Sequence, residues 1–133
     1  MLTLEKANKM ITASQKKAEE LGIAVTTYVV DSNGILIASS KMDGALAVSP
    51  IFAEAKAYTS GTLGLSTAQI AKYAESGKPY YGVDNLSGGK LTTIAGGFPI
   101  KEGEKLIGGI GVGGSYDVSQ DVACAENALS VLS

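Results

Sequence analysis

The chain has 133 residues and a formal net charge of −2, and it contains no histidine, arginine or tryptophan. The missing histidine excludes Ser-His-Asp and Cys-His catalysis, and without arginine or excess positive charge we expect no nucleic-acid binding. No apolar run approaches the ~20 residues that cross a bilayer, so we expect no membrane partner. The N-terminus lacks a secretory signal and Cys124 is the only cysteine, which predicts one cytoplasmic domain over residues 1–133 without an internal disulfide.

Residues 4–21 form the first predicted helix. Thr3 is a candidate N-cap, and Gly22 suits the position that follows the last turn. Apolar and small residues recur at steps of three and four, which places them on one face of the helix. They are Leu4, Ala7, Ile11, Ser14, Ala18 and Leu21.

The segment IAVTTYVVDSNGILIASSKMDGA predicts a β-hairpin. Two β-rich runs, 23–30 and 35–42, flank Asn33-Gly34, a pair typical of a type I′ turn, in which both central residues have a positive φ. Met42, Asp43 and Gly44 then leave the sheet. The thioether of Met42 is either a soft ligand at a pocket or a core side chain, and Asp43-Gly44 reads most simply as a turn.

A second helix is predicted to begin with Ser49 as its N-cap and Pro50 in its first turn, and to run to about Ser60. Small residues on one of its faces permit close packing against a sheet or a partner subunit. Lys56 lies among small residues in AEAKAYTSG. It is either a functional lysine, paired with a ligand carboxylate or a buried acid, or an ordinary solvated helix lysine.

The segment STAQIAKYAESG predicts a short third helix between Ser66 and Gly77, followed by a loop with one short strand near residues 82–86. Two tyrosines, Tyr80 and Tyr81, lie in this loop. They either stack on a flat ligand or bind a metal through a phenolate, or they hold the loop with their rings in the core and their hydroxyls in water.

Residues 90–100 and 105–113 predict a second hairpin, closed by the polar turn KEGEK. Pro99 cannot donate to a ladder, so we expect it at a strand end or on an edge strand. A last helix is predicted over 118–132, and Asp121 is explained there as a charge that favours the helix dipole. Because hairpins dominate this order, the chain predicts an α+β fold, with an antiparallel sheet covered by helices.

The second hairpin also contains the spacing G-x-G-x-x-G, at Gly109, Gly111 and Gly114. As a dinucleotide fingerprint this spacing needs a complete βαβ unit with a second parallel strand. The sequence stops at Ser133, directly after the last predicted helix, so we expect no dinucleotide site. The glycines instead leave room for a covering helix, a neighbouring subunit or a ligand.

In combination, these segments resemble the GlcG/HbpS-like family, also called the haem-degrading domain family. The matching segments, in family order over nearly the whole chain, are LTLEKANKMITASQKKAEELG, VVDSNGILIASSKMDGA, AEAKAYTSG, GGFPIKEGEKLIGGIGVGG and QDVACAENALSVL. The resemblance implies a profilin-like fold: a five-stranded antiparallel sheet flanked by helices, assembled into homo-oligomers. It also implies binding of haem or a related tetrapyrrole in some members, and genes beside glycolate, glycerol or diol utilisation genes in some.

The resemblance further marks a set of family landmarks: Asp43, Gly44, Lys56, Gly96, Gly97, Phe98 and Pro99. Where the family uses a histidine on haem iron, this chain has none. An axial ligand from the protein would therefore be a tyrosine, methionine, lysine or cysteine.

Three functions follow from the residues and the resemblance. The first is a small-molecule-binding module, with haem or a related tetrapyrrole or corrinoid as the ligand class. The second is a homo-oligomeric assembly protein with a vestigial pocket, and the third is an enzyme acting on a small metabolite through Lys56 or a tyrosine. No catalytic constellation or metal site is predicted. The expected ligand-binding residues are Met42, Asp43, Gly44, Lys56, Tyr80, Tyr81, Gly96, Gly97, Phe98 and Pro99.

Overall fold

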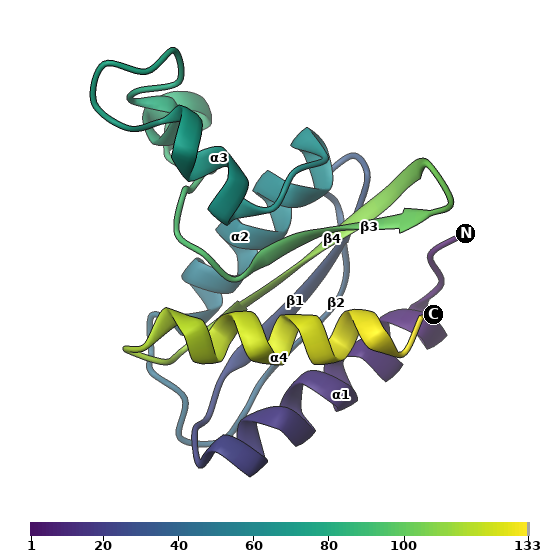
Figure 1. Cartoon of the computed structure of the whole chain (residues 1–133). Helices are drawn as coiled ribbons and strands as arrows, with labels where there is room; N and C mark the ends of the chain where they lie inside the picture. Colours follow the sequence, from purple (N-terminus) through teal and green to yellow (C-terminus); the bar gives the residue numbers. More distant parts are fainter. Residues whose placement is uncertain (133) are drawn as a thin grey trace.

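The computed structural model describes residues 1–132 and has three layers (Figure 1). A four-stranded antiparallel sheet, with strand order β2-β1-β4-β3, lies between helix α2 on one face and helices α1 and α4 on the other. The elements are α1 Leu4–Leu21, β1 Thr26–Asp31, β2 Leu36–Lys41, α2 Ser49–Leu63, α3 Thr67–Tyr73, the 3₁₀ helix η1 Val83–Gly88, β3 Gly97–Glu102, β4 Lys105–Gly113 and α4 Val118–Ser130. The predicted α+β class with an antiparallel sheet is confirmed.

The prediction of five strands is wrong, because residues 1–132 contain four. The short strand expected near 82–86 is replaced by η1, which Gly82 and Gly89 flank with φ values of +85° and +86°. Such left-handed residues turn the chain and cannot continue an extended ladder. Residues 90–96 are not a strand either, since the Thr92 N–H donates to Thr59 Oγ1 of α2 (2.9 Å).

The first helix and the first hairpin are confirmed, but the type of the hairpin turn is not. Thr3 Oγ1 accepts from the Lys6 N–H and caps α1. In the hairpin only Gly34 of the Asn33-Gly34 pair has a positive φ, +80°, so the turn is not type I′. Asp31 Oδ1 accepts from the Asn33 N–H at 2.8 Å and from the Ile35 N–H at 3.0 Å. These bonds favour a three-residue loop that ends in a left-handed glycine.

The glycines of β4 are explained by the helix that covers them. Gly109, Gly111 and Gly113 alternate along the strand and therefore face the same side of the sheet. A Cβ at Gly109 or Gly111 would meet the backbone of α2, at Ala57 in both cases. Helix α2 thus approaches the sheet backbone to backbone, and of the three occupants expected for this space the covering helix is the one found. Because every strand pairing in residues 1–132 is antiparallel, the G-x-G-x-x-G spacing lies outside any βαβ unit.

The start of α2 differs from the prediction. Its N-cap is Val48, without a side-chain capping bond. Ser49 is the first helical residue, and its hydroxyl is hydrogen-bonded to Thr26 Oγ1 at 2.8 Å, so it attaches the helix to β1 instead of capping it. The helix continues past Ser60 to Leu63, where Gly64 ends it with a φ of +77°.

The remaining helices follow the prediction with shorter ends. Helix α3 begins with the Ser66 capping box but stops at Tyr73, before Gly77, and α4 ends at Ser130. Pro99 lies on β3, which is an edge strand, as expected. Figure 1 shows that α3 and η1 project beyond the sheet; residues 66–89, which contain both, are called the arm below. No helix within residues 1–132 is long and apolar enough to cross a membrane.

Candidate functional site

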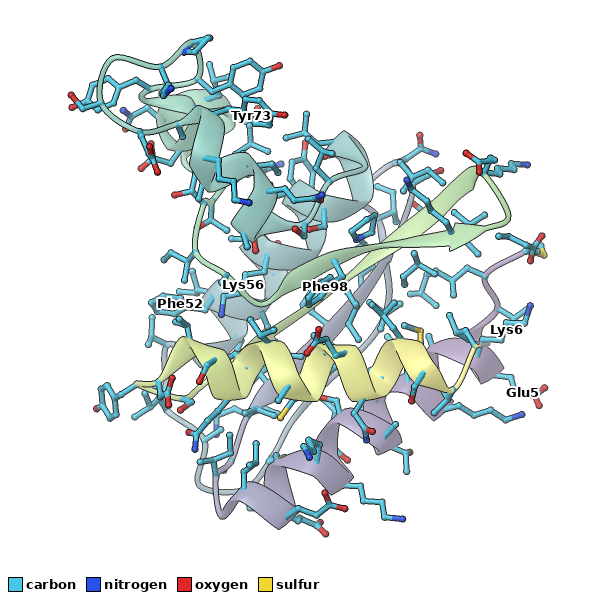
Figure 2. All side chains as sticks on the ribbon, in the orientation of Figure 1. Glu5, Lys6, Phe52, Lys56, Tyr73 and Phe98 are labelled. Carbon is cyan, nitrogen blue, oxygen red and sulfur yellow. The ribbon has the colours of Figure 1, made fainter. Side chains whose placement is uncertain are left out.

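Lys56 is the most unusual residue of the buried interior. It lies on α2 with 1% of its surface exposed, the largest of the fully buried side chains. Its Nζ donates to the Val112 carbonyl at 2.7 Å and to Asp121 Oδ2 at 3.1 Å. The side chain leaves α2, passes the ends of β3 and β4 and points toward α4 (Figure 2). The interpretation of Lys56 as a solvated helix lysine is therefore wrong, and its alternative as partner of a buried acid is confirmed.

Asp121 is the acid that the sequence interpretation missed. It lies in the first turn of α4 with 1% of its surface exposed, and its Oδ1 accepts from the Ser115 N–H at 3.1 Å. Its role is not limited to the helix dipole, because its other oxygen binds Lys56. A signal was present: Asp121 shares the spacing i, i+3, i+4, i+7 with Cys124, Ala125 and Ala128, all of them buried.

The glycines beside Lys56 make room for its charged end. Gly96 has a φ of +121°, and a Cβ there would lie 2.9 Å from Lys56 Nζ and 2.9 Å from the Val112 carbonyl oxygen. Gly97 packs on the Lys56 backbone from the other side, and its N–H donates to Thr67 Oγ1 at 3.0 Å. Any larger residue at Gly96 would therefore displace the ammonium group.

A cavity of about 440 Å³ opens next to this ion pair. Most of its wall is apolar, and the side chains at its rim, such as Leu46, Phe52 and Tyr116, are exposed to water. The Phe52 ring lies 5.8 Å from Lys56 Nζ. The volume falls in the range of small-molecule sites, which combine apolar walls with a few fixed polar groups. The full lining is Leu46, Ala47, Val48, Ser49, Phe52, Lys56, Ile94, Gly114, Ser115, Tyr116, Val118 and Asp121.

A larger groove, of about 780 Å³, runs along α1 past Leu4, Asn8 and Thr12. Its titratable side chains, Glu5 and Lys9 among them, are exposed to water. Unlike this groove, the cavity beside Lys56 combines apolar walls with a buried charged pair, so it is the candidate functional site.

Burial acts on both charges of the pair. It lowers the pKa of Lys56, an effect that the nearby Asp121 carboxylate opposes. It raises the pKa of Asp121, against the opposing effects of Lys56 and of the Ser115 N–H. Both directions have the same cause: removing a charged group from water favours its neutral form. The neutral amine and the neutral carboxylic acid are therefore closer in free energy to the ion pair here than they would be in water.

The other predicted ligand-binding residues do not gather at this cavity. Met42 packs on the core under α1 and α4, and its sulfur accepts from the Val25 N–H at 3.4 Å. Asp43 is exposed, and Gly44 forms a turn with a φ of +81°. Phe98 packs on the same core as Met42. Of the ten residues, Lys56 and Gly96 meet at the ion pair, with Gly97 behind them.

Tyr80 and Tyr81 lie on the arm, where they line a separate hollow of about 350 Å³. The Tyr80 ring lies 6.1 Å from the Tyr73 ring, and both Tyr80 and Tyr81 are exposed. Within residues 1–132, no three cysteine, aspartate or glutamate side chains are placed to hold a metal ion.

The comparison with known families decides what kind of protein this is. The family model of the HbpS-like haem-degrading proteins matches residues 2–130. The chain belongs to this family. The similarity suggested by the sequence segments is thus confirmed at the level of the family.

Among curated proteins, this HbpS-like chain is 34% identical over 132 residues to an uncharacterized 15.0 kDa protein from the dhaT-dhaS intergenic region of Citrobacter freundii, covering 99% of this chain and 92% of that protein. It is 30% identical over 131 residues to the corrinoid adenosyltransferase PduO of the same organism, covering 98% of this chain but only 39% of PduO. Among solved structures, a PduOC–haem complex superimposes with a TM-score of 0.92 at 29% identity, covering 97% of this chain and 93% of that one.

Proposed function

We propose that this HbpS-like chain is a small-molecule-binding module and that the cavity beside Lys56 is its binding site. The observation that carries this proposal is the buried ion pair in the cavity wall. Lys56 has three N–H donors, of which the described residues accept two. An apolar cavity with one fixed, incompletely used donor favours a ligand with an apolar body and one oxygen acceptor.

A tetrapyrrole is the ligand class that the relatives favour, since the solved structure of a relative is a haem complex. The apolar walls of the cavity suit the faces of a macrocycle. Tyr116 lines the cavity and is 92% exposed, and a tyrosine phenolate is a known axial ligand of haem iron. Lys56 is the only cation in the lining and is bonded to Asp121, so haem propionates would find no free positive charge there.

A haem titration followed by absorbance tests the proposal. We expect a saturable shift of the Soret band at micromolar haem. Val118→Asp, which adds a charge to the apolar wall, should abolish the shift, and Tyr116→Phe should change the position of the band. The matched control is Tyr81→Phe on the arm, which should leave the titration unchanged. A titration without a Soret shift would contradict the tetrapyrrole assignment, and a shift lost in Tyr81→Phe alone would contradict the placement of the site in this cavity. A corrinoid is the second ligand to titrate, because one relative is a corrinoid adenosyltransferase.

A second candidate, a homo-oligomeric assembly protein, rests on the arm. Its side chains Tyr73, Tyr81 and Leu86 are 53%, 70% and 59% exposed, and exposed apolar groups that lie together favour protein contacts. Light scattering tests this candidate. We expect a multiple of the monomer mass that falls when Tyr81 and Leu86 are both replaced by serine. A monomeric mass for the unmodified chain would contradict it.

A further inference from the structure

We infer that Lys56 is a carbonyl-capturing residue: its ε-amine forms an imine with an aldehyde held in the cavity, and Asp121 moves the protons. The inference rests on the proposed function only in that both use the same cavity. It goes further, because it assigns a covalent reaction to a pair that could otherwise serve structure alone.

Lys56 differs from every other lysine of the chain. It is buried, whereas the remaining ten lysines are exposed or half-buried at the surface. A solvated lysine is a strongly hydrated ammonium, but a lysine in an apolar site is more readily neutral and is the type that forms Schiff bases. The Val112 carbonyl fixes the amine at 2.7 Å, and Lys56 is part of the cavity lining.

A proton acceptor for the Lys56 amine is already in place. Asp121 Oδ2 lies 3.1 Å from Nζ, within the reach required of a general base. The Ser115 N–H donates to the other oxygen of this carboxylate at 3.1 Å, and the side chain is 1% exposed, so its orientation does not depend on solvent. Transfer of one proton from Nζ to Oδ2 produces a free amine and a neutral acid, and burial of the pair makes this transfer less costly.

Imine formation then balances with the amine, the aldehyde and Asp121 as the reacting groups. The Nζ lone pair forms a C–N bond to the aldehyde carbon, the C=O π electrons move to oxygen, and one proton passes from nitrogen to that oxygen through Asp121. The resulting carbinolamine loses its hydroxyl as water, which takes the proton held by Asp121, and the nitrogen lone pair forms the C=N bond. The ammonium and the aldehyde thus become a protonated imine and water, and the protonated imine replaces the ammonium beside the Asp121 carboxylate.

The lining indicates which aldehydes fit. Leu46, Phe52 and Val118 give the wall an apolar and aromatic character, and the single cation of the lining is neutralised by Asp121. The site therefore favours an aldehyde with an uncharged, apolar or aromatic body over a phosphorylated or carboxylated one.

Reductive trapping tests the inference directly. The intact chain is incubated with benzaldehyde and sodium cyanoborohydride at pH 7, and the site of benzylation is mapped by mass spectrometry. We expect one benzyl group per chain, on Lys56, formed about a hundredfold more slowly in Asp121→Asn, the lower end of what general acid–base assistance contributes. Lys72→Met, which removes an exposed lysine, is the matched control and should label like the unmodified chain.

Lys56→Met leaves Asp121 without its partner and can unfold the chain, so the double variant Lys56→Met with Asp121→Asn supplies a neutral replacement. Its fold is checked by circular dichroism, and it should lose the single benzyl group. Labelling spread evenly over the surface lysines, or unchanged labelling in the double variant, would overturn the inference. Haem binding without trapping would overturn this inference alone, while trapping without haem binding would overturn only the tetrapyrrole assignment.

Discussion

The two faces of the sheet are packed by different means. Toward α1 and α4 the sheet presents side chains such as Val29 and Ile110, which interdigitate with those of the helices in an ordinary apolar core. Toward α2 it presents the glycines of β4, and the helix backbone lies against the strand backbone. The first face fills its space with side chains, whereas the second has glycines in their place along β4. The same close approach carries Lys56 past the end of the sheet to Asp121, so the unusual packing and the candidate site share one cause.

The largest expected effect comes from breaking the ion pair between the two faces. Lys56→Met leaves the buried Asp121 carboxylate unpaired, and we expect a loss of about 3–5 kcal/mol in the free energy of unfolding. Urea denaturation followed by circular dichroism measures it. Lys56→Met combined with Asp121→Leu removes both charges and should recover most of the loss. If the double variant were as unstable as the single one, the cost would lie in packing and not in the unpaired charge.

A methyl group on the glycine strand should cost somewhat less. In Gly111→Ala the added Cβ meets the backbone at Ala53 and Ala57, which cannot rotate away, so we expect a loss of about 3 kcal/mol, at the upper end for overpacking. The matched change on the other face is Ile110→Val, next to it in β4, which should cost only about 1 kcal/mol. Equal losses in urea denaturation would show that the two faces are packed alike.

The pH dependence of stability separates the charges from the packing. The pKa of Asp121 is raised in the folded state. At pH values just above its ordinary pKa of 3.8, the folded chain therefore binds more protons than the unfolded chain. The free energy of unfolding should fall as the pH rises through this range. The pKa of Lys56 is lowered, so stability should rise again as pH approaches the ordinary value of 10.5. Both slopes should be smaller in the double variant Lys56→Met with Asp121→Leu, measured by urea denaturation at each pH. Identical profiles would exclude a contribution from the pair.

The smallest perturbation is chemical modification of Cys124, which needs no substitution and tests the packing on the side of α1 and α4. Cys124 is fully buried there, and burial raises the pKa of its thiol to about 11. At pH 8 we expect its reaction with a disulfide reagent to be about a hundredfold slower in the folded chain than in urea, since the thiolate is the reactive form. A rate equal to that in urea would show that this face opens readily.

The sequence predicted the elements better than the site. Periodicity, caps and turn residues are local signals, and they located α1, both hairpins and the start of α3 at Ser66. The fifth strand, predicted near residues 82–86, does not form, because left-handed glycines on both sides of η1 prevent an extended backbone there. The site depends on contacts distant in the sequence: Lys56 and Asp121 are 65 residues apart. The spacing within α4 showed an acid on an apolar face, but only the fold shows which cation it meets.

We propose that this HbpS-like chain binds its ligand in the cavity beside Lys56. A crystal structure of the chain grown with saturating haem tests it most directly. We expect ligand density in the cavity beside the Lys56–Asp121 pair, in contact with Phe52 and Tyr116. Density against Tyr80 and Tyr81 on the arm, or a cavity without ligand, would contradict this placement of the binding site.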